Sequence, residues 1–217
     1  MLKLLDMTET RSQALRVWFV AMLAAAAAVV FAFKHVDVPV LRAVLPISPH
    51  LAVLGHSLGS TILLSFEAVL FLTLAVSRTV HGTISPLGRT TAAACVSSMC
   101  AYAINASVLK VMFGVQPSGY VLTGWPHALH WFAGTADSSF PSGHMVLAGA
   151  FAGVLMRHYP KAILPLAGLL AFAAALLVLG TWHFVSDVLA GAFVGVTAGL
   201  AAAEIWLAHE RTLAGRT

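Results

Sequence analysis

Two residues near the end of the chain, His183 and Asp187, have the types and the spacing that nucleophilic or acid–base chemistry requires. They are four positions apart, so on a helix they share one face and their side chains can touch. A carboxylate beside an imidazole fixes the position of the ring proton and stabilises the charged ring. The other ring nitrogen then becomes a better nucleophile or base. A His–Asp pair that only caps a helix has the same spacing, so both interpretations stay open at this point.

The segment Pro141-Ser142-Gly143-His144 has the features of an anion-binding helix start. Free N–H groups and the positive end of the helix dipole attract anions. Ser142 can add a hydroxyl donor, and Gly143 permits close approach of the backbone. His144 would then stand beside a bound phosphate and could protonate a leaving oxygen. Pro-Ser-Gly also occurs in ordinary turns, so the segment alone is compatible with a plain helix start.

The elements that must position these residues are membrane helices, because the composition excludes a water-soluble fold. Of the 217 residues, 59% are hydrophobic and 9% are charged, and the mean hydropathy is +0.90. A soluble domain carries roughly 25% charged residues. The net charge of +4 comes from Lys and Arg that lie between apolar runs, which indicates membrane topology and no nucleic-acid partner. Cys95 and Cys100 fall within one apolar run and predict buried thiols, with neither a disulfide framework nor a metal site.

Six apolar segments approach the ~20 residues that a helix needs to cross a bilayer. We therefore predict an all-α fold, a six-transmembrane-helix bundle that forms one domain over residues 1–217. The expected helices are roughly 17–33, 56–76, 90–113, 142–156, 162–179 and 184–208. The segments 34–55 and 114–141 are rich in Pro and Gly and are expected to be loops. Glu67 and Asn105 lie inside predicted spans, where we expect interhelical hydrogen bonds.

The Lys and Arg between the spans predict the orientation of the chain. Cytoplasmic loops carry an excess of these residues. If the N-terminus is cytoplasmic, nine of the twelve fall on the inner side: Lys3, Arg11, Arg16, Arg78, Arg89, Arg157, Lys161, Arg211 and Arg216. The outer side holds Lys34, Arg42 and Lys110. Lys110, at the end of the third predicted helix, then shares the outer face with both motifs described above.

Phe140-Pro-Ser-Gly-His144, followed by His183-x-x-x-Asp187-Val-Leu-Ala-Gly, resembles the type 2 phosphatidic acid phosphatase (PAP2) superfamily over roughly residues 100–200. The resemblance implies a membrane bundle of the PAP2 type. It also implies that His183 attacks phosphorus to form a phosphohistidine, that Asp187 orients His183, and that His144 is the general acid. The residues expected to bind phosphate oxygens are Ser142, Gly143 and Lys110. No metal or other cofactor is expected, because Lys and N–H donors can stabilise the charge.

The chain departs from the family pattern at two arginines. The family's first motif places Arg-Pro after a lysine and six residues, whereas Lys110 is followed by a segment one residue shorter that ends in Gln116-Pro117. The third motif places Ser-Arg about seven residues ahead of its histidine, where this chain has Leu176 and Leu177. A phosphomonoester carries nearly two negative charges and favours bidentate arginine. A phosphodiester substrate or a phosphotransferase reaction is therefore an alternative.

A second explanation is that a residue of the long loop replaces an arginine. The candidates are Gln116, His127 and His130. The two histidines lie in a stretch with Trp125 and Trp131, so they also fit an aromatic belt at the membrane interface.

These observations together predict a metal-independent membrane lipid phosphatase. It would hydrolyse a lipid phosphate or diphosphate at the periplasmic face of a bacterial inner membrane, with the lipid itself left open. The predicted catalytic residues are His183, His144 and Asp187, and the predicted substrate-binding residues are Lys110, Ser142, Gly143, Gln116 and His130. The alternatives are a lipid phosphodiester head-group phosphotransferase with the same core, or a non-enzymatic or transport membrane protein. The expected partners are the lipid-phosphate substrate and membrane lipids.

Overall fold

The structure, a computed structural model, describes residues 2–46 and 60–214. In these two ranges the chain forms helices joined by turns and loops, with no strand. Five described segments are long and apolar enough to cross a membrane: Leu15–His35, Thr61–His81, Pro86–Leu122, Pro160–Leu179 and Val185–Thr212. The chain is therefore an integral membrane protein with an all-α fold.

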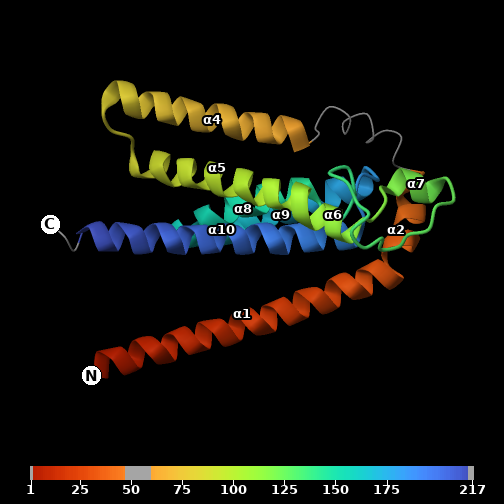
Figure 1. The fold of residues 1–217 in the computed structure, drawn as a ribbon, viewed down its shortest axis with the longest axis horizontal. Coiled ribbons are helices and arrows are strands. Elements are labelled where there is room, and N and C mark those ends of the chain that lie inside the picture. The colour runs from red at the N-terminus through yellow and green to blue at the C-terminus, as the bar shows by residue number, and fades with distance from the viewer. Residues whose placement is uncertain (1, 47–59, 215–217) are drawn as a thin grey trace.

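The long helices of Figure 1 carry these segments. They are α1 (Leu2–His35), α4 (Ser60–His81), α5 (Pro86–Ile104), α9 (Ile163–Leu179) and α10 (Val185–Ala214). The 3₁₀ turn η2 (Pro160–Ala162) precedes α9, and a π-helical turn, η1 (Asn105–Leu109), joins α5 to α6 (Lys110–Phe113). The remaining predicted span, the fourth along the chain (142–156), is α8 (Gly143–His158), which packs against α4, α5, α9 and α10. Its 16 residues fall short of the ~20 that a bilayer requires, so in the described ranges length and composition identify five spans, and the predicted count of six is not confirmed.

The first helix is longer than predicted. α1 begins at Leu2, whereas the apolar run predicts a start at Val17. Residues 2–16 contain neither Pro nor Gly and consist largely of good helix formers, so the helix extends beyond the membrane-spanning part. For the same reason α10 continues past the predicted end at residue 208 as far as Ala214.

The predicted loop 34–55 contains a short helix, α2 (Asp37–Val44). Pro39 does not prevent it, because the residue falls in the first turn, where a missing N–H breaks no intrahelical hydrogen bond. Residues 47–59, which include the first four residues of the predicted helix 56–76, lie outside the described part of the chain.

The predicted loop 114–141 contains α7 (Ser118–Leu122) and then folds back over α6. α6 ends at Gly114, whose φ of +58° is the left-handed conformation that favours glycine. A Cβ at Gly114 would lie 2.2 Å from the backbone oxygen of His130. Three backbone N–H groups of the returning segment donate to carbonyl oxygens at the end of α6, at 2.8–3.1 Å. The loop is therefore held against the helix end that carries Lys110.

The most extensive helix packing in the described ranges joins α8 and α10. α10 carries Gly191, Gly195 and Gly199 at four-residue spacing, and a Cβ on each would lie 2.2–2.6 Å from a backbone oxygen. Those oxygens belong to residues with the same spacing: Ser142, Val146 and Ala150. Small residues allow membrane helices to approach this closely. The matching order of the contacts means that the two helices run in the same direction and start side by side.

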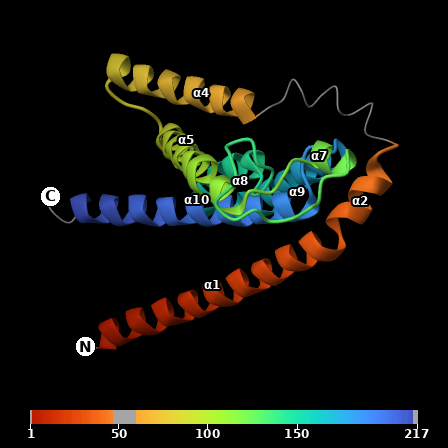
Figure 2. The ribbon, with the colours of Figure 1, turned by 45° about the vertical axis from the view of Figure 1, so that its right-hand side comes forward.

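Both predicted motifs therefore lie at one end of the bundle. Figures 1 and 2 show α2, α6 and α7 at this end, whereas the beginning of α1 and the end of α10 lie at the opposite end. The starts of α8 and α10 are at the α6 end, because the two helices run parallel.

The two polar residues inside the predicted spans are hydrogen-bonded. The Ser98 hydroxyl of α5 donates to Glu67 of α4, which confirms the predicted interhelical bond. Asn105 instead donates from Nδ2 to the carbonyl oxygen of Pro141 at 3.3 Å. It therefore links the π-helical turn to the segment that leads into α8.

Candidate active site

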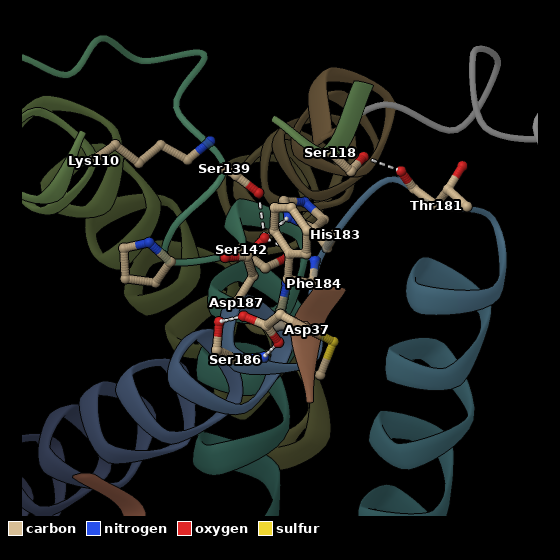
Figure 3. A network of polar contacts seen from close by, with 12 residues as sticks. Asp37, Lys110, Ser118, Ser139, Ser142, Thr181, His183, Phe184, Ser186 and Asp187 are labelled. Carbon is tan, nitrogen blue, oxygen red and sulfur yellow. Dashed lines mark hydrogen bonds and ion pairs between the residues drawn. The ribbon is translucent and has the colours of Figure 1, made fainter. Parts of the chain in front are cut away.

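His183 and Asp187 lie at the start of α10. His183 precedes the helix, Asp187 is in its first turn, and His183 Nδ1 lies 3.2 Å from Asp187 Oδ2. Asp187 is fully buried, and His183 is 9% exposed. Figure 3 shows the pair within a larger set of polar contacts. Because Nδ1 is engaged by the carboxylate, Nε2 is the ring nitrogen of His183 that is left for chemistry.

The Asp187 carboxylate is held by two further donors. Its Oδ2 accepts a hydrogen bond from the Phe184 N–H at 2.9 Å and another from the Ser139 hydroxyl. The bond to Phe184 is half of a capping box, in which a first-turn side chain reaches back to the residue before the helix. The carboxylate therefore caps α10 and contacts His183 at the same time, so the two interpretations of the spacing are compatible.

His144, in the first turn of α8, faces the same region as His183. The centroids of the two rings are 5.6 Å apart, and the ring planes are nearly perpendicular, at 75°. The His144 ring also lies 6.4 Å from the Trp182 ring. Two imidazoles from different helices thus stand close enough to contact one bound group.

Ser142 and Gly143 join the two helix starts. The Ser142 hydroxyl caps α8 by accepting from the Met145 N–H at 3.4 Å, and the Ser142 N–H donates to the Asp187 carbonyl oxygen at 3.1 Å. A Cβ on Gly143 would lie 2.9 Å from the Tyr102 ring. Both residues are buried, and neither lines the cavity described below. Their visible contribution is to fix α8 against α10.

A cavity of about 400 Å³ lies at this end of the bundle. His144 and His183 line it, together with Lys110 and the hydroxyl-bearing residues Thr61, Tyr102, Ser138 and Ser139. Lys110 Nζ donates to the Ala136 carbonyl oxygen at 3.1 Å, and Figure 3 shows the side chain extending toward the segment that carries Ser139. Asp137 also lines the cavity. The cavity therefore combines a cation, hydroxyl groups and two imidazoles, which can bind a phosphate group, with one carboxylate.

Gln116 and His130 do not line this cavity, although the sequence predicted both to contact substrate. Gln116 is half-buried, and its neighbour Pro117 lines the cavity instead. His130 is half-buried, and its backbone N–H donates to the Phe113 carbonyl oxygen at 3.0 Å. His127 is also absent from the lining; it pairs with Asp37 at 2.9 Å. None of the three therefore supplies a side chain to the cavity wall in place of an arginine.

Leu176 and Leu177, which occupy the positions of the Ser-Arg of the third family motif, do not line the cavity either. Leu177 is buried in an apolar cluster with Met145 and Val188, and Leu176 is exposed on the outside of α9. The local structure uses the backbone here: the carbonyl oxygen of Leu177 accepts from the N–H groups of Trp182 and His183, at 3.0 and 3.3 Å. The turn that presents His183 is thus built on this leucine.

Four residues of the polar network were not predicted from the sequence: Ser139, Asp37, Ser186 and, as an ion-pair partner, His127. Ser139 lies two residues before a predicted motif, but serine is common in loops and gives no pattern. Asp37 is 90 residues from His127 and 149 from Ser186, so their contact depends on the tertiary fold. In the described ranges no three His, Cys, Asp or Glu side chains are arranged to hold a metal ion.

A family model described as the PAP2 superfamily matches residues 90–211, which is more than half of the chain. The matched range contains Lys110, the segment 141–144 and the His183–Asp187 pair. No curated protein and no solved structure matches the chain.

Proposed function

Because the chain belongs to the PAP2 superfamily, we propose that it hydrolyses a lipid phosphate or diphosphate through a phosphohistidine. Members of this superfamily are phosphatases and phosphotransferases that act on phosphate esters. The observation that carries this proposal is the pair of imidazoles, 5.6 Å apart on one polar cavity, one of which is held by a buried carboxylate. A single phosphoryl group between the two rings can be attacked from one side and protonated on the other.

The proposed reaction has two steps. In the first, His183 Nε2 attacks phosphorus, the bond from phosphorus to the lipid oxygen breaks, and protonated His144 gives its proton to that oxygen. In the second, His144 takes a proton from water, the water oxygen attacks phosphorus, and the phosphorus–nitrogen bond breaks. The products are the lipid alcohol (or a lipid with one phosphate fewer) and inorganic phosphate. His144 ends protonated, and His183 is free for the next cycle.

The charge of the phosphoryl group is met without arginine. Lys110 lines the cavity, and its ammonium is a point charge close to where the oxygens would lie. The positive end of the α8 dipole points toward the same region. Ser138 and Tyr102 add hydroxyl groups to the lining. These groups stabilise charge that develops in the transition state and are already in place before the reaction.

The cavity lies at the end of the bundle opposite to the beginning of α1 and the end of α10. If both of these helix ends face the cytoplasm, as the distribution of Lys and Arg predicts, the cavity opens at the outer face, which is periplasmic in a bacterial inner membrane. An amphiphile with its head group at that level would reach the cavity from within the membrane.

The alternative is a phosphodiester head-group phosphotransferase that uses the same His183, His144 and Asp187. One observation favours it: apolar Leu177 stands where a family arginine would bind a second phosphate charge, and it is buried in the core. A phosphodiester carries a single negative charge and depends less on bidentate arginine. In this case a lipid alcohol replaces water in the second step.

The test is phosphate release by the purified protein in detergent with EDTA present. The substrates are lipid phosphomonoesters, diphosphates and phosphodiesters, and His183→Ala is compared with the matched variant His158→Ala at the far end of α8. We expect release from one substrate class, a loss on the order of a thousandfold in His183→Ala, and little change in His158→Ala. Head-group exchange between lipids without phosphate release would instead support the phosphotransferase. Full activity in His183→Ala, or no reaction of either kind, would contradict the proposal.

A further inference from the structure

A second buried carboxylate stands close to the first. Asp37, the first residue of α2, is 1% exposed and makes three polar contacts. Its Oδ1 accepts from the Ser186 N–H at 2.9 Å, and its Oδ2 accepts from the Ser186 hydroxyl at 2.5 Å. The third partner is His127 Nε2, which lies 2.9 Å from Oδ2. Asp37 therefore connects the short helix after the first span with the first turn of α10.

His127 is fixed on both faces of its ring. The ring centroid is 4.2 Å from that of Phe33 and 4.2 Å from that of Phe184. Nε2 faces Asp37, and Nδ1 has no hydrogen-bond partner among the described residues. The ring is thus held by two aromatic contacts and one polar contact. Phe184 is the residue next to His183, so the packing of His127 bears directly on the turn that carries the proposed nucleophile.

Two carboxylates share the first turn of α10. Asp187 accepts from the Phe184 N–H, and Asp37 accepts from the Ser186 N–H. Backbone N–H groups in the first turn of a helix have no intrahelical partner, and a negative charge there is stabilised by the helix dipole. The two capped N–H groups, of Phe184 and Ser186, are two residues apart. They lie between His183 and Asp187 in the chain, so both carboxylates hold the backbone that joins this pair. Figure 3 shows Asp37 and Ser186 next to the His183–Asp187 pair.

We propose that Asp37 and His127 form a positioning pair that holds the first turn of α10 so that Asp187 orients His183 for attack. This inference rests on the proposed function. Neither residue lines the cavity, so their effect passes through Ser186 and Phe184. The pair sets the rate of the chemical step and leaves substrate binding unchanged, because it touches the backbone behind the nucleophile. A displacement of about 1 Å at a reacting group can reduce the rate on the order of a hundredfold.

The first test compares Asp37→Asn with Glu67→Gln. Glu67 is the matched control: it is a buried carboxylate bonded to one serine, on a helix that carries no proposed catalytic residue. In Asp37→Asn we expect kcat to fall by about 10- to 100-fold with KM within about twofold, while Glu67→Gln retains the wild-type kcat. Equal losses in both variants would indicate general destabilisation and overturn the proposal, as would an unchanged kcat in Asp37→Asn.

The second test separates the polar contact of His127 from its packing. His127→Phe keeps a ring between Phe33 and Phe184 but removes the donor, and His127→Gln keeps a donor at the position of Nε2. We expect kcat to fall in His127→Phe and to be largely restored in His127→Gln. The double variant of Asp37→Asn and His127→Phe should be no slower than the worse single variant, because paired residues act as a unit. Losses that multiply, or no difference between Phe and Gln, would overturn the proposal.

The third measurement does not depend on turnover. Amide hydrogen exchange of peptides that cover residues 183–190 is compared between wild type, Asp37→Asn and Glu67→Gln in detergent. Faster exchange confined to these residues in Asp37→Asn, by about tenfold or more, supports the positioning pair even if no tested substrate reacts. Unchanged exchange there overturns it, whereas inactivity of the wild type would contradict only the proposed function.

Discussion

Asp187 concentrates three hydrogen bonds on one carboxylate oxygen, from Ser139, Phe184 and His183. Asp187→Asn preserves the size of the side chain and can preserve the bonds to Ser139 and Phe184. It removes the negative charge that stabilises His183 when the ring becomes positive during attack. We expect a loss of kcat on the order of a thousandfold, with a thermal unfolding midpoint within a few degrees of the wild type. Phosphate release and thermal unfolding of the same preparation measure the two effects.

The control for this variant is Glu204→Gln, which neutralises an exposed carboxylate paired with Arg157. It should leave kcat unchanged, because an exposed ion pair contributes little. Wild-type activity in Asp187→Asn would show that the carboxylate only caps α10.

His144 is predicted to act in both steps, and the two roles can be separated by the leaving group. In His144→Ala, a lipid alkoxide has no acid to protonate it, so the first step slows by about a hundredfold to ten-thousandfold. A nitrophenyl phosphate, whose leaving group needs no proton, should lose less in the first step. Its phosphohistidine should then accumulate, because no base activates water. Alkaline quenching of a reaction with radiolabelled substrate measures this intermediate, and equal losses for both leaving groups would argue against His144 as the acid.

At the scale of the helices, the glycine stripe of α10 determines whether the two motifs meet. A Cβ on Gly195 would lie 2.5 Å from the Val146 backbone oxygen, so the helices must separate to admit one. We expect Gly195→Ala to destabilise the fold by about 1–3 kcal/mol and to lower kcat, because α8 carries His144. Gly168→Ala on α9 is the matched control, since nothing lies within 4 Å of its Cβ position. Thermal unfolding in detergent compares the two variants, and equal midpoints would contradict the close packing of α8 and α10.

At the scale of the whole molecule, the sequence predicted features that depend on local patterns and missed features that depend on tertiary contacts. Apolar runs of bilayer length predicted the long spans, because a membrane helix forms all of its backbone hydrogen bonds within one continuous segment. The His183–Asp187 spacing and the helix start at residues 141–144 are also local patterns. The extension of α1 to Leu2 was missed because a polar sequence is compatible with both helix and loop. The α2 helix was missed because Pro39 was read as a helix breaker, although it falls in the first turn of the helix.

Contacts between segments that are distant in the chain could not be predicted from the sequence. Asp37 lies in a predicted loop with no motif around it, and only the fold brings it to Ser186 and His127. The sequence left His127 open between a replacement for an arginine and a member of an aromatic belt; its ring does lie between two phenylalanines, but its nitrogen faces a buried carboxylate. Gln116 and His130 were chosen for their chemistry alone, and neither lines the cavity; the backbone of His130 is held against the end of α6.

The orientation of the molecule in the membrane gives the last prediction. The six predicted spans place nine of the twelve Lys and Arg on the same side of the membrane as the beginning of α1. The excess predicts that this side is cytoplasmic. The cavity lies at the other end of the bundle. In the test, Cys95 and Cys100 are first replaced by Ala. A single cysteine is then placed at one of two exposed positions. Ala133 is in the loop beside the cavity, and Thr212 is near the end of α10. A thiol reagent that does not cross membranes should label Ala133→Cys in intact bacterial cells and Thr212→Cys only after lysis, because cytoplasmic segments retain the positive charges. The reverse pattern would place the cavity at the cytoplasmic face, and labelling of both cysteines in intact cells would contradict three membrane crossings, by α8, α9 and α10, between residues 133 and 212.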